Sequence, residues 1–391
     1  MQYNNINKLL KLKDVNVKKV IEKNDSTEIH ITTKPKPHIC PCCGNETTKI
    51  HDYRLQKIKD IPFLYRTTYL ILNKRRYQCK CGKRFYESYE FLPRYHRMTR
   101  RTIKSIVKEL QKVSSLKSVA EQFNVSTPTV TRILNTIRYP KPKLPKVLCI
   151  DEFKGNAETG KFQAILVDGK RHQVIDILPT RSTDYLINYF MECPRSERLR
   201  VEYFICDMWQ PYRDIAASLF PNAKIIVDKY HFVRQVNWAV ENVRKQAQKT
   251  MPASLRKYYK KSRKLLLAPY NDLSKEYQSA VDIMLLYHDD LRQAHYLKEL
   301  FYKIRNEVKY SKQRDLMDLW IKYAEKSNIK VFERLAKTYR NWRSYILNGY
   351  KYGYTNGPTE GFNNKIKVLK RVSYGLRNFN RYRNRILLTC N

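Results

Sequence analysis

Three acidic residues stand where they could hold divalent metal ions. Asp151 follows the apolar run VLCI, and Asp207 follows VEYFIC. Both runs are short and apolar, which predicts buried strands that end at an acidic side chain. Glu360 lies much later, near the predicted start of a helix in TNGPTEGFNNKIK. Two strand-end aspartates and a helical glutamate supply the oxygen ligands that Mg²⁺ prefers.

Such a site suits phosphodiester chemistry, in which the attacking and leaving oxygens must both be stabilised. Two divalent ions about 3.5–4 Å apart do this in many enzymes. We expect Asp151 and Asp207 to hold two Mg²⁺ or Mn²⁺ ions, and Glu360 to close the site. A single strand-end aspartate is more often a solvated residue, so the prediction depends on the three acids occurring together.

Other acidic residues compete for this role. Glu152 should point away from the site because side chains alternate along a strand. Asp168 is expected in a turn, and Asp176 is also a rival. Asp228 and His231 occur in VDKYHF, at a predicted strand-to-helix junction. They could contact the metal ligands and hold them in position, or they could serve only as a helix cap or as core residues.

Four cysteines near the N-terminus have the spacing of a second metal site. They form a CxxC and a CxC pair, each followed by glycine: Cys40, Cys43, Cys79 and Cys81. Four thiolates around one Zn²⁺ would make a closed, structural site. Cys42 could replace Cys43, although the wider CxxC spacing favours Cys43. The alternative is a set of unrelated buried thiols.

The charge of the chain points to its partner. Lys and Arg total 77 against 36 Asp and Glu, a formal net charge of +41. Such an excess is typical of proteins that neutralise phosphates, so double-stranded DNA is the expected partner. A basic membrane-surface protein is the alternative, but no apolar run approaches the roughly 18–20 residues of a spanning helix. The first residues lack a signal-peptide core, so we expect a cytoplasmic, nucleoid-associated protein.

The pattern of elements predicts several domains. Residues 1–97, with a hairpin around Asn24 and long alternating runs, should form a β-rich zinc-binding domain. Residues 98–138 have helical periodicity and read as a helix-turn-helix, although a plain helical connector is the alternative. Its last helix would present four side chains to a major groove: Thr127, Thr129, Thr131 and Arg132. Residues 139–146 are a proline-rich linker.

Residues 147–391 should form the catalytic domain. Three strands that can pair as a meander are followed by strands alternating with helices, which is the order of a ribonuclease H-like α/β core. Residues from about 232 to 350 contain only helical patterns, which predicts a helical insertion in this domain. A final helix should bury Phe362, Ile366 and Leu369. Its opposite face should carry Glu360, Asn364, Lys367 and Arg371.

Several of these motifs resemble the DDE transposases of the ISL3 insertion-sequence family. The resemblance rests on IDEFKG, ICDMWQPY, VDKYHFVRQ and TNGPTEGFNNKIKVLKR, with CPCCG and CKCG resembling that family's zinc finger. It implies Asp151, Asp207 and Glu360 as the catalytic triad. It also implies that Lys367 lies near the DNA end. Arg371, on the same face of the predicted helix, is a further candidate for DNA binding.

The sequence therefore predicts a transposase. It would bind the terminal inverted repeats of its element, cleave there and join the freed ends to target DNA, as a homodimer or higher oligomer. One alternative is a DNA-binding regulator in which the zinc ribbon and helix-turn-helix act without catalysis. Another is a ribonuclease H-like nuclease or resolvase that cuts but does not join.

Overall fold

The structure is a computed structural model, and it describes residue 7, residues 10–155 and residues 159–391. The chain divides into two compact units: residues up to Pro140 together with Lys365–Asn391, and Lys141–Asn364. The sequence predicts one domain over residues 147–391, whereas residues 365–391 group with the first unit. The reason is that α16 (Phe379–Cys390) packs against helices of that unit.

A five-stranded sheet forms the N-terminal part of the first unit. Its strands are β1 (Val15–Lys23), β2 (Ser26–Thr33), β5 (Ile50–Phe63), β6 (Arg66–Gln78) and β7 (Arg84–Tyr86). The order is β1-β2-β6-β5, with β7 paired to β6. β1 and β2 form the predicted hairpin, and alternate apolar residues such as Ile31 and Leu72 are buried on one face. β3 (His38–Ile39) and β4 (Glu46–Thr47) pair separately beside the cysteines.

Three short helices follow, in the order that the sequence predicts: α2 (Arg100–Glu109), α3 (Leu116–Gln122) and α4 (Thr127–Thr136). Ser115 caps α3 through its hydroxyl, and Ser126 with Pro128 begins α4. Asn124 makes the turn between them with a φ of 51°. Apolar residues of all three helices form one core, which Leu388 of α16 completes.

The second unit is built on a mixed five-stranded sheet. Its strands are β8 (Val147–Lys154), β9 (Phe162–Asp168), β10 (Gln173–Leu178), β11 (Tyr203–Cys206) and β12 (Lys224–Val227), in the order β10-β9-β8-β11-β12. β8, β9 and β10 are antiparallel, whereas β8, β11 and β12 run parallel. The connecting helices are α5 (Thr183–Met191), α6 (Arg195–Leu199) and α7 (Gln210–Leu219). Their apolar faces pack with the sheet residues in one core.

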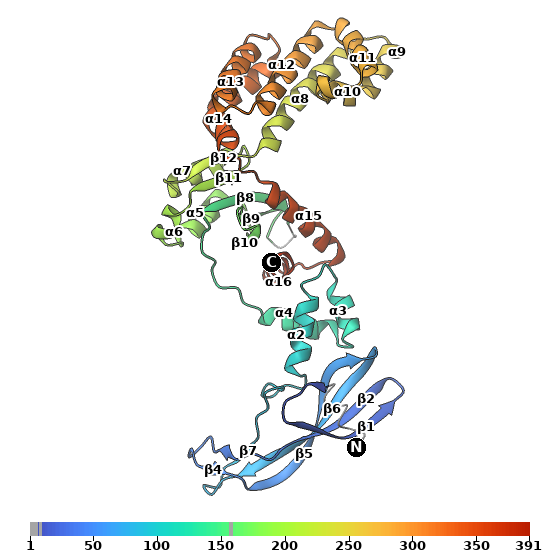
Figure 1. Cartoon of the computed structure of the whole chain (residues 1–391), viewed down its shortest axis with the longest axis vertical. Helices are drawn as coiled ribbons and strands as arrows, with labels where there is room; N and C mark the ends of the chain where they lie inside the picture. The colour runs from blue at the N-terminus through green and yellow to red at the C-terminus, as the bar shows by residue number, and fades with distance from the viewer. Residues whose placement is uncertain (1–6, 8–9, 156–158) are drawn as a thin grey trace. The chain divides into compact units, whose positions relative to one another are not determined.

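Helices alone occupy residues 229–352, all of which have a described backbone. They are α8 (Lys229–Ala247), α9 (Ala253–Lys261), α10 (Arg263–Leu267), α11 (Lys275–Leu286), α12 (Asp289–Asn306), α13 (Tyr310–Glu325) and α14 (Lys330–Tyr352), with a short 3₁₀ turn at Tyr270–Asp272. Figure 1 shows α12, α13 and α14 side by side. Phe301, Trp320 and Tyr339 pack together at their centre.

The end of α14 returns to the sheet. Gly349 lies so close to β12 that an added Cβ would sit 3.1 Å from the carbonyl oxygen of Val227. Asn348 donates its side-chain amide to the carbonyl of Ile225 at 2.8 Å. Gly353, with a φ of 73°, then ends α14 in a left-handed conformation that favours glycine. The chain is thus brought back beside β12 before α15 (Gly357–Val372) begins.

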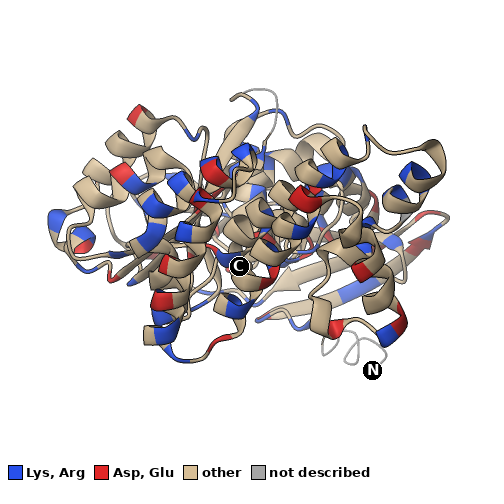
Figure 2. Cartoon of the chain, turned by 90° about the horizontal axis from the view of Figure 1, so that it is seen from above, with Lys and Arg blue, Asp and Glu red and all other residues tan. Residues whose placement is uncertain are grey.

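Positive charge is spread over the whole chain. Lys and Arg side chains occur on strands and helices throughout the described structure (Figure 2). Among the described helices, none is long and apolar enough to cross a membrane.

Candidate active site and metal centres

The three parallel strands of the second unit align three aspartates. Ile205 of β11 lies opposite Cys149 of β8, and Cys206 lies opposite Val227 of β12. Continuing the same register, Asp207 follows β11 at the level of Asp151, and Asp228 follows β12 at the level of Asp207. Asp207 and Asp228 directly follow their strands, whereas β8 continues past Asp151 to Lys154 instead of ending there as predicted. The three aspartates nevertheless lie in one row across the sheet.

The electrostatics of Asp151 fit a cation at this edge. Burial, and after it the negative charge of Asp207, raises the pKa of Asp151 to about 7. The energetic cost of holding two ionised carboxylates close together in a partly buried place falls when a divalent cation lies between them. The donor set of carboxylate oxygens is the one that Mg²⁺ and Mn²⁺ bind.

His231, in the first turn of α8, contacts the second aspartate. Its Nε2 lies 3.0 Å from Asp207 Oδ1. Burial alone would lower the pKa of His231, but the hydrogen bond to Asp207 and the surrounding carboxylates outweigh burial and raise it. A protonated His231 would partly neutralise Asp207 and fix the position of its carboxylate.

Asp228 is buried and connects the starts of α8 and α15 through hydrogen bonds. One carboxylate oxygen accepts a hydrogen bond from the backbone of Tyr230 at 3.1 Å and caps α8. The other accepts from the backbone N–H of Asn356 at 2.9 Å. Asn356 also donates its side-chain amide to the carbonyl of Ile150 at 3.4 Å. Asp228 therefore ties the start of α15 to the strand ends that carry Asp151 and Asp207.

Asn363 is a site residue that the sequence reasoning missed. Its side-chain Nδ2 donates to Asp151 Oδ2 at 2.8 Å, and the residue is buried. The other oxygen of Asp151 accepts from the backbone of Glu152 at 2.7 Å. The helical spacing that places Ile366 on the buried face also places Asn363 there, so periodicity alone could have identified it.

Glu360 lies in the first turn of α15 and is exposed. Among the described residues, the only group of three or more Cys, His, Asp or Glu ligands within 4.8 Å of one another is formed by cysteines. The carboxylates of Asp151, Asp207 and Glu360 are thus not gathered that closely. Of the predicted faces of α15, Ile366 and Leu369 are buried and Phe362 is half-buried, whereas Asn364, Lys367 and Arg371 are exposed.

The rival acids have other partners. Glu152 forms an ion pair with Arg181. Asp168 accepts from the backbones of Lys170 and Arg171 at 2.9 and 3.0 Å, as expected of a turn residue. Asp176 is buried and accepts from the hydroxyl of Tyr189 at 3.0 Å.

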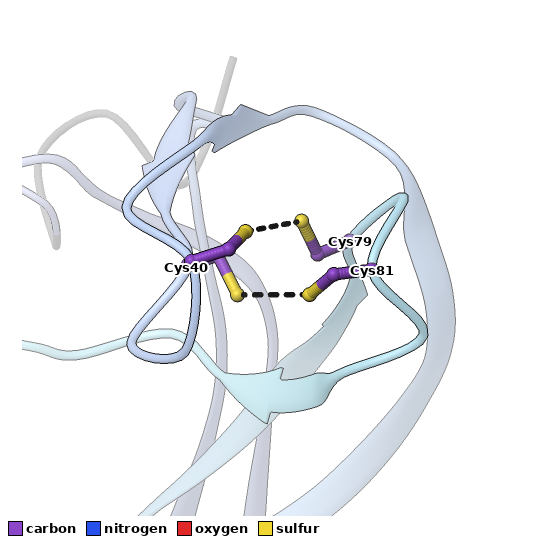
Figure 3. A group of neighbouring side chains, drawn as sticks. Cys40, Cys79 and Cys81 are labelled. Atoms are coloured by element: carbon purple, nitrogen blue, oxygen red, sulfur yellow. Dashed lines mark hydrogen bonds between the residues drawn. The ribbon is translucent and has the colours of Figure 1, made fainter.

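The second site is a cluster of four cysteines in the first unit. Its members are Cys40, Cys43, Cys79 and Cys81, whose sulfur atoms all lie within 4.8 Å of one another. Sγ of Cys40 is 3.7 Å from that of Cys81 (Figure 3), and Sγ of Cys43 is 3.5 Å from that of Cys79. Cys42 is exposed and lies outside this group. The set offers the thiolate ligands of a closed tetrahedral Zn²⁺ site.

Two matching turns hold these cysteines. Gly44, with a φ of 73°, donates its backbone N–H to the carbonyl of Cys40, and Gly82, with a φ of 85°, donates to that of Cys79. The backbone N–H of Cys42 points at the Cys40 sulfur at 3.4 Å. A sulfur that accepts such a bond is stabilised as a thiolate. The bond from Gly82 to Cys79 matches that from Gly44 to Cys40, so the shorter CxC spacing makes a comparable knuckle.

The side chains predicted to read bases lie on α4 of the helix-turn-helix and differ in exposure. Arg132 is exposed and donates to Thr129 Oγ1 at 3.1 Å. Thr131 is half-buried and its hydroxyl donates to the carbonyl of Thr127 at 3.0 Å. Arg132 is therefore the most accessible of the four predicted base-reading side chains.

Comparisons with known proteins agree with these features. Residues 148–386 match the family model of the ISL3 transposases, described as transposase. The chain belongs to the ISL3 family of transposases. Residues 36–81 of the transposase match the zinc finger of the IS204, IS1001, IS1096 and IS1165 transposases. Residues 87–138 match the helix-turn-helix domain of the ISL3 family.

Two curated relatives that match over long stretches are transposases. The chain is 28% identical over 370 residues to the transposase for insertion sequence element IS1001 of Bordetella parapertussis, covering 89% of this chain and 88% of that one. It is 22% identical over 240 residues to the transposase for IS1557 of Mycobacterium tuberculosis, covering 56% and 54%. The transposase is thus a DNA-binding enzyme with an N-terminal zinc ribbon, a helix-turn-helix and a mixed α/β DDE domain.

Proposed function

We propose that this transposase binds the terminal inverted repeats of its own element and hydrolyses a strand at each end. The freed 3′-hydroxyl is then joined to target DNA. The observation that carries the proposal is that Asp151, on β8, and Asp207, directly after β11, lie at the same level of two adjacent parallel strands, with the pKa of Asp151 raised by burial and by Asp207.

Asp151, Asp207 and Glu360 are the residues that would hold two Mg²⁺ or Mn²⁺ ions. When bound, such ions stabilise the attacking and leaving oxygens of a phosphodiester. Glu360 is exposed on the first turn of α15, where its carboxylate is accessible to DNA and to ions. We expect it to move toward the two aspartates when ions and the DNA end are bound.

The remaining site residues position these carboxylates. Asn363 holds Asp151 from α15, and His231 holds Asp207 from α8. Asp228 sets the start of α15 through the backbone of Asn356. A misplacement of about 1 Å in a reacting group can cost a hundredfold in rate, so these contacts matter although none of them touches the substrate.

The fold proposed for the catalytic domain is ribonuclease H-like. The antiparallel meander β10-β9-β8, continued by the parallel strands β11 and β12, supports it. Helices α8 to α14 would then be an insertion, at about residues 232–350, between the second aspartate and the glutamate. The domains would be residues 1–97, residues 98–138 and residues 147–391, with residues 139–146 as linker.

The N-terminal domains would recognise the DNA ends. Zn²⁺ held by Cys40, Cys43, Cys79 and Cys81 would fix the β-rich domain. Thr127, Thr129, Thr131 and Arg132 of α4 would face a major groove. The exposed Lys367 and Arg371 would contact phosphates near the cleaved end. Cleaving both ends of one element requires a homodimer or higher oligomer on the DNA.

The test is to incubate the protein with Mg²⁺ and duplex DNA that carries the end of its element and flanking sequence. The proposal predicts cleavage at the element end and joining of the 3′-hydroxyl to a second DNA. Specific binding without cleavage, in Mg²⁺ and also in Mn²⁺, would favour a regulator. Cleavage without joining would favour a nuclease or resolvase.

A further inference from the structure

Helix α8 carries an exposed aromatic and cationic ridge that the proposed chemistry leaves without a role. Tyr230, Arg234 and Trp238 recur every four residues and so share one face of the helix. Tyr230 is 52% and Trp238 54% exposed, although both are large and partly apolar. The guanidinium of Arg234 lies 4.5 Å from the ring centre of Trp238 and 5.9 Å from that of Tyr230. The cation is thus stacked between two aromatic rings.

The ridge begins at the candidate active site. Tyr230 is adjacent to His231, and the two rings meet edge to face at 5.7 Å. Trp238 lies about 15 Å along the helix axis from Asp228, at 1.5 Å per residue. A DNA strand leaving the carboxylates along α8 would reach it within a few nucleotides.

Two hollows flank Trp238 and differ in chemistry. The first, about 400 Å³, is lined by the apolar and aromatic side chains of Tyr230, Val233, Trp238 and Leu267 and by the polar side chains of Arg234, Asn237 and Arg263. Aromatic and aliphatic side chains beside a few hydrogen-bonding groups suit a planar nucleobase.

The second hollow, about 670 Å³, shares Trp238 and Arg263 with the first and adds Lys245 and Lys260. Its one carboxylate, Glu241, lies 2.7 Å from Arg244 and also forms ion pairs with Arg263 at 3.3 Å and Lys245 at 3.9 Å. Four cations therefore line the hollow beside one carboxylate, and Arg263, Lys245 and Lys260 are exposed, so the hollow keeps a positive charge that suits phosphate. The two hollows share Trp238 and Arg263. The first could therefore hold a base while the second holds the phosphates next to it in the same strand.

We propose that this ridge binds an unpaired stretch of DNA strand close to the cleaved end, with a base stacked on Trp238 and phosphates at Arg263, Lys245 and Lys260. A base within a duplex is covered on both faces by its neighbours, so only an unpaired base can occupy the first hollow. The inference rests on the proposed function, because that function brings DNA to Asp151 and Asp207. Stacking of a base on an exposed aromatic ring is a recurring device for holding single strands.

The test measures binding without chemistry, with no Mg²⁺ or Mn²⁺ added and at raised salt, using the full chain. The probes are a fluorescein-labelled twelve-residue oligothymidylate, a duplex of equal length, and the same oligothymidylate with one 2-aminopurine. We expect Trp238→Ala to bind the single strand about ten- to hundredfold more weakly. Duplex binding should stay within about twofold, and the quenching of 2-aminopurine should be lost. Trp238→Phe should retain most of the affinity because a ring remains.

Controls separate stacking from other roles. Tyr277→Ala removes another half-exposed ring, from α11, and should change nothing. Lys245→Ala should reduce the salt dependence of single-strand binding while leaving the 2-aminopurine quenching in place. Equal losses for single strand and duplex would overturn the proposal. Unchanged DNA binding by Trp238→Ala would also overturn it. If that variant binds DNA like the wild type but sediments differently, the ridge is a protein interface instead.

The outcome is independent of the carboxylate site. If Trp238→Ala fails these tests while the wild type cleaves and joins DNA, only the strand-binding site is wrong. If the single strand binds as proposed but no cleavage occurs in Mg²⁺ or Mn²⁺, the catalytic proposal fails instead.

Discussion

Asn363 on α15 donates its side-chain amide to Asp151 of β8, at 2.8 Å. This bond joins α15 to the first strand of the sheet in the second unit. Because Asn363 and Glu360 are one turn apart on α15, the residue that orients Asp151 also sets the distance from Asp151 to Glu360.

Asn363→Ala should reduce end cleavage by about ten- to hundredfold, since a hydrogen bond to a charged group contributes roughly 1.5–3 kcal/mol. DNA binding should not change. The Mg²⁺ concentration for half-maximal rate should rise, because Asp151 would no longer be held in place. Asn380→Ala, an exposed amide on α16, is the control. An unchanged rate and unchanged Mg²⁺ dependence would show that the bond has no role in positioning Asp151.

Asp228→Ala should destabilise the second unit. The change removes the cap of α8 and leaves the backbone N–H of the buried Asn356 without its acceptor. Together these losses should cost roughly 2–4 kcal/mol, a fall in Tm of about 5–10 °C. Thermal unfolding followed by circular dichroism measures this. Asp214→Ala is the control, because this side chain is 54% exposed, and it should change Tm by less than about 1 °C. Equal shifts in Tm for both variants would show that Asp228 does not stabilise the starts of α8 and α15.

Zinc content should depend on four of the five N-terminal cysteines. Cys40→Ser and Cys81→Ser should each lose the ion, because a closed site needs all four thiolates. Cys42→Ser should keep one zinc per chain, since Cys42 is exposed and lies outside the sulfur cluster. Elemental analysis of the purified variants decides this. Loss of zinc in Cys42→Ser, with retention in Cys40→Ser, would reverse the ligand assignment.

DNA binding should weaken steeply with salt, because each neutralised phosphate releases condensed counterions. Arg132→Ala should reduce the preference for the element's end over competitor DNA if this side chain reads a base, by about 1–3 kcal/mol. Lys117→Ala, an exposed cation on α3, should lower affinity for both DNAs alike. Titrations at two salt concentrations distinguish these effects. If Arg132→Ala behaves as wild type on both DNAs, α4 is not the reading helix.

Local patterns in the sequence predicted most elements that carry the site. The strands before Asp151 and Asp207, the helix-turn-helix and the helix containing Glu360 all have clear apolar periodicity, and each occurs in the structure. The turn role of Asp168 also followed from its neighbours. These features depend on residues close together in the chain, which is why a single sequence was sufficient.

Contacts between distant segments were not predictable in this way. The helical period places Asn363 on the buried face of α15, but its partner Asp151 lies 212 residues earlier, so the hydrogen bond between them has no local signal. Arg385 is buried and donates to the carbonyls of Lys112 and Ser114 at 2.9 and 2.8 Å, a contact between segments more than 270 residues apart. That interaction places α16 with the helix-turn-helix rather than with the catalytic core. The parallel pairing of β2 with β6 likewise has no local signal.

The central claim is that three carboxylates act together, and Glu360→Gln tests it most directly. The substitution keeps the shape of the side chain and the helix but removes one negative charge from a site that must hold divalent cations. Asp168→Asn and Asp176→Asn serve as controls for the loss of an acid elsewhere on the sheet. End cleavage and strand transfer should be measured in Mg²⁺ and in Mn²⁺, beside DNA binding. The account predicts that Glu360→Gln binds DNA like the wild type and does not cleave it; cleavage near the wild-type rate would contradict the three-carboxylate site.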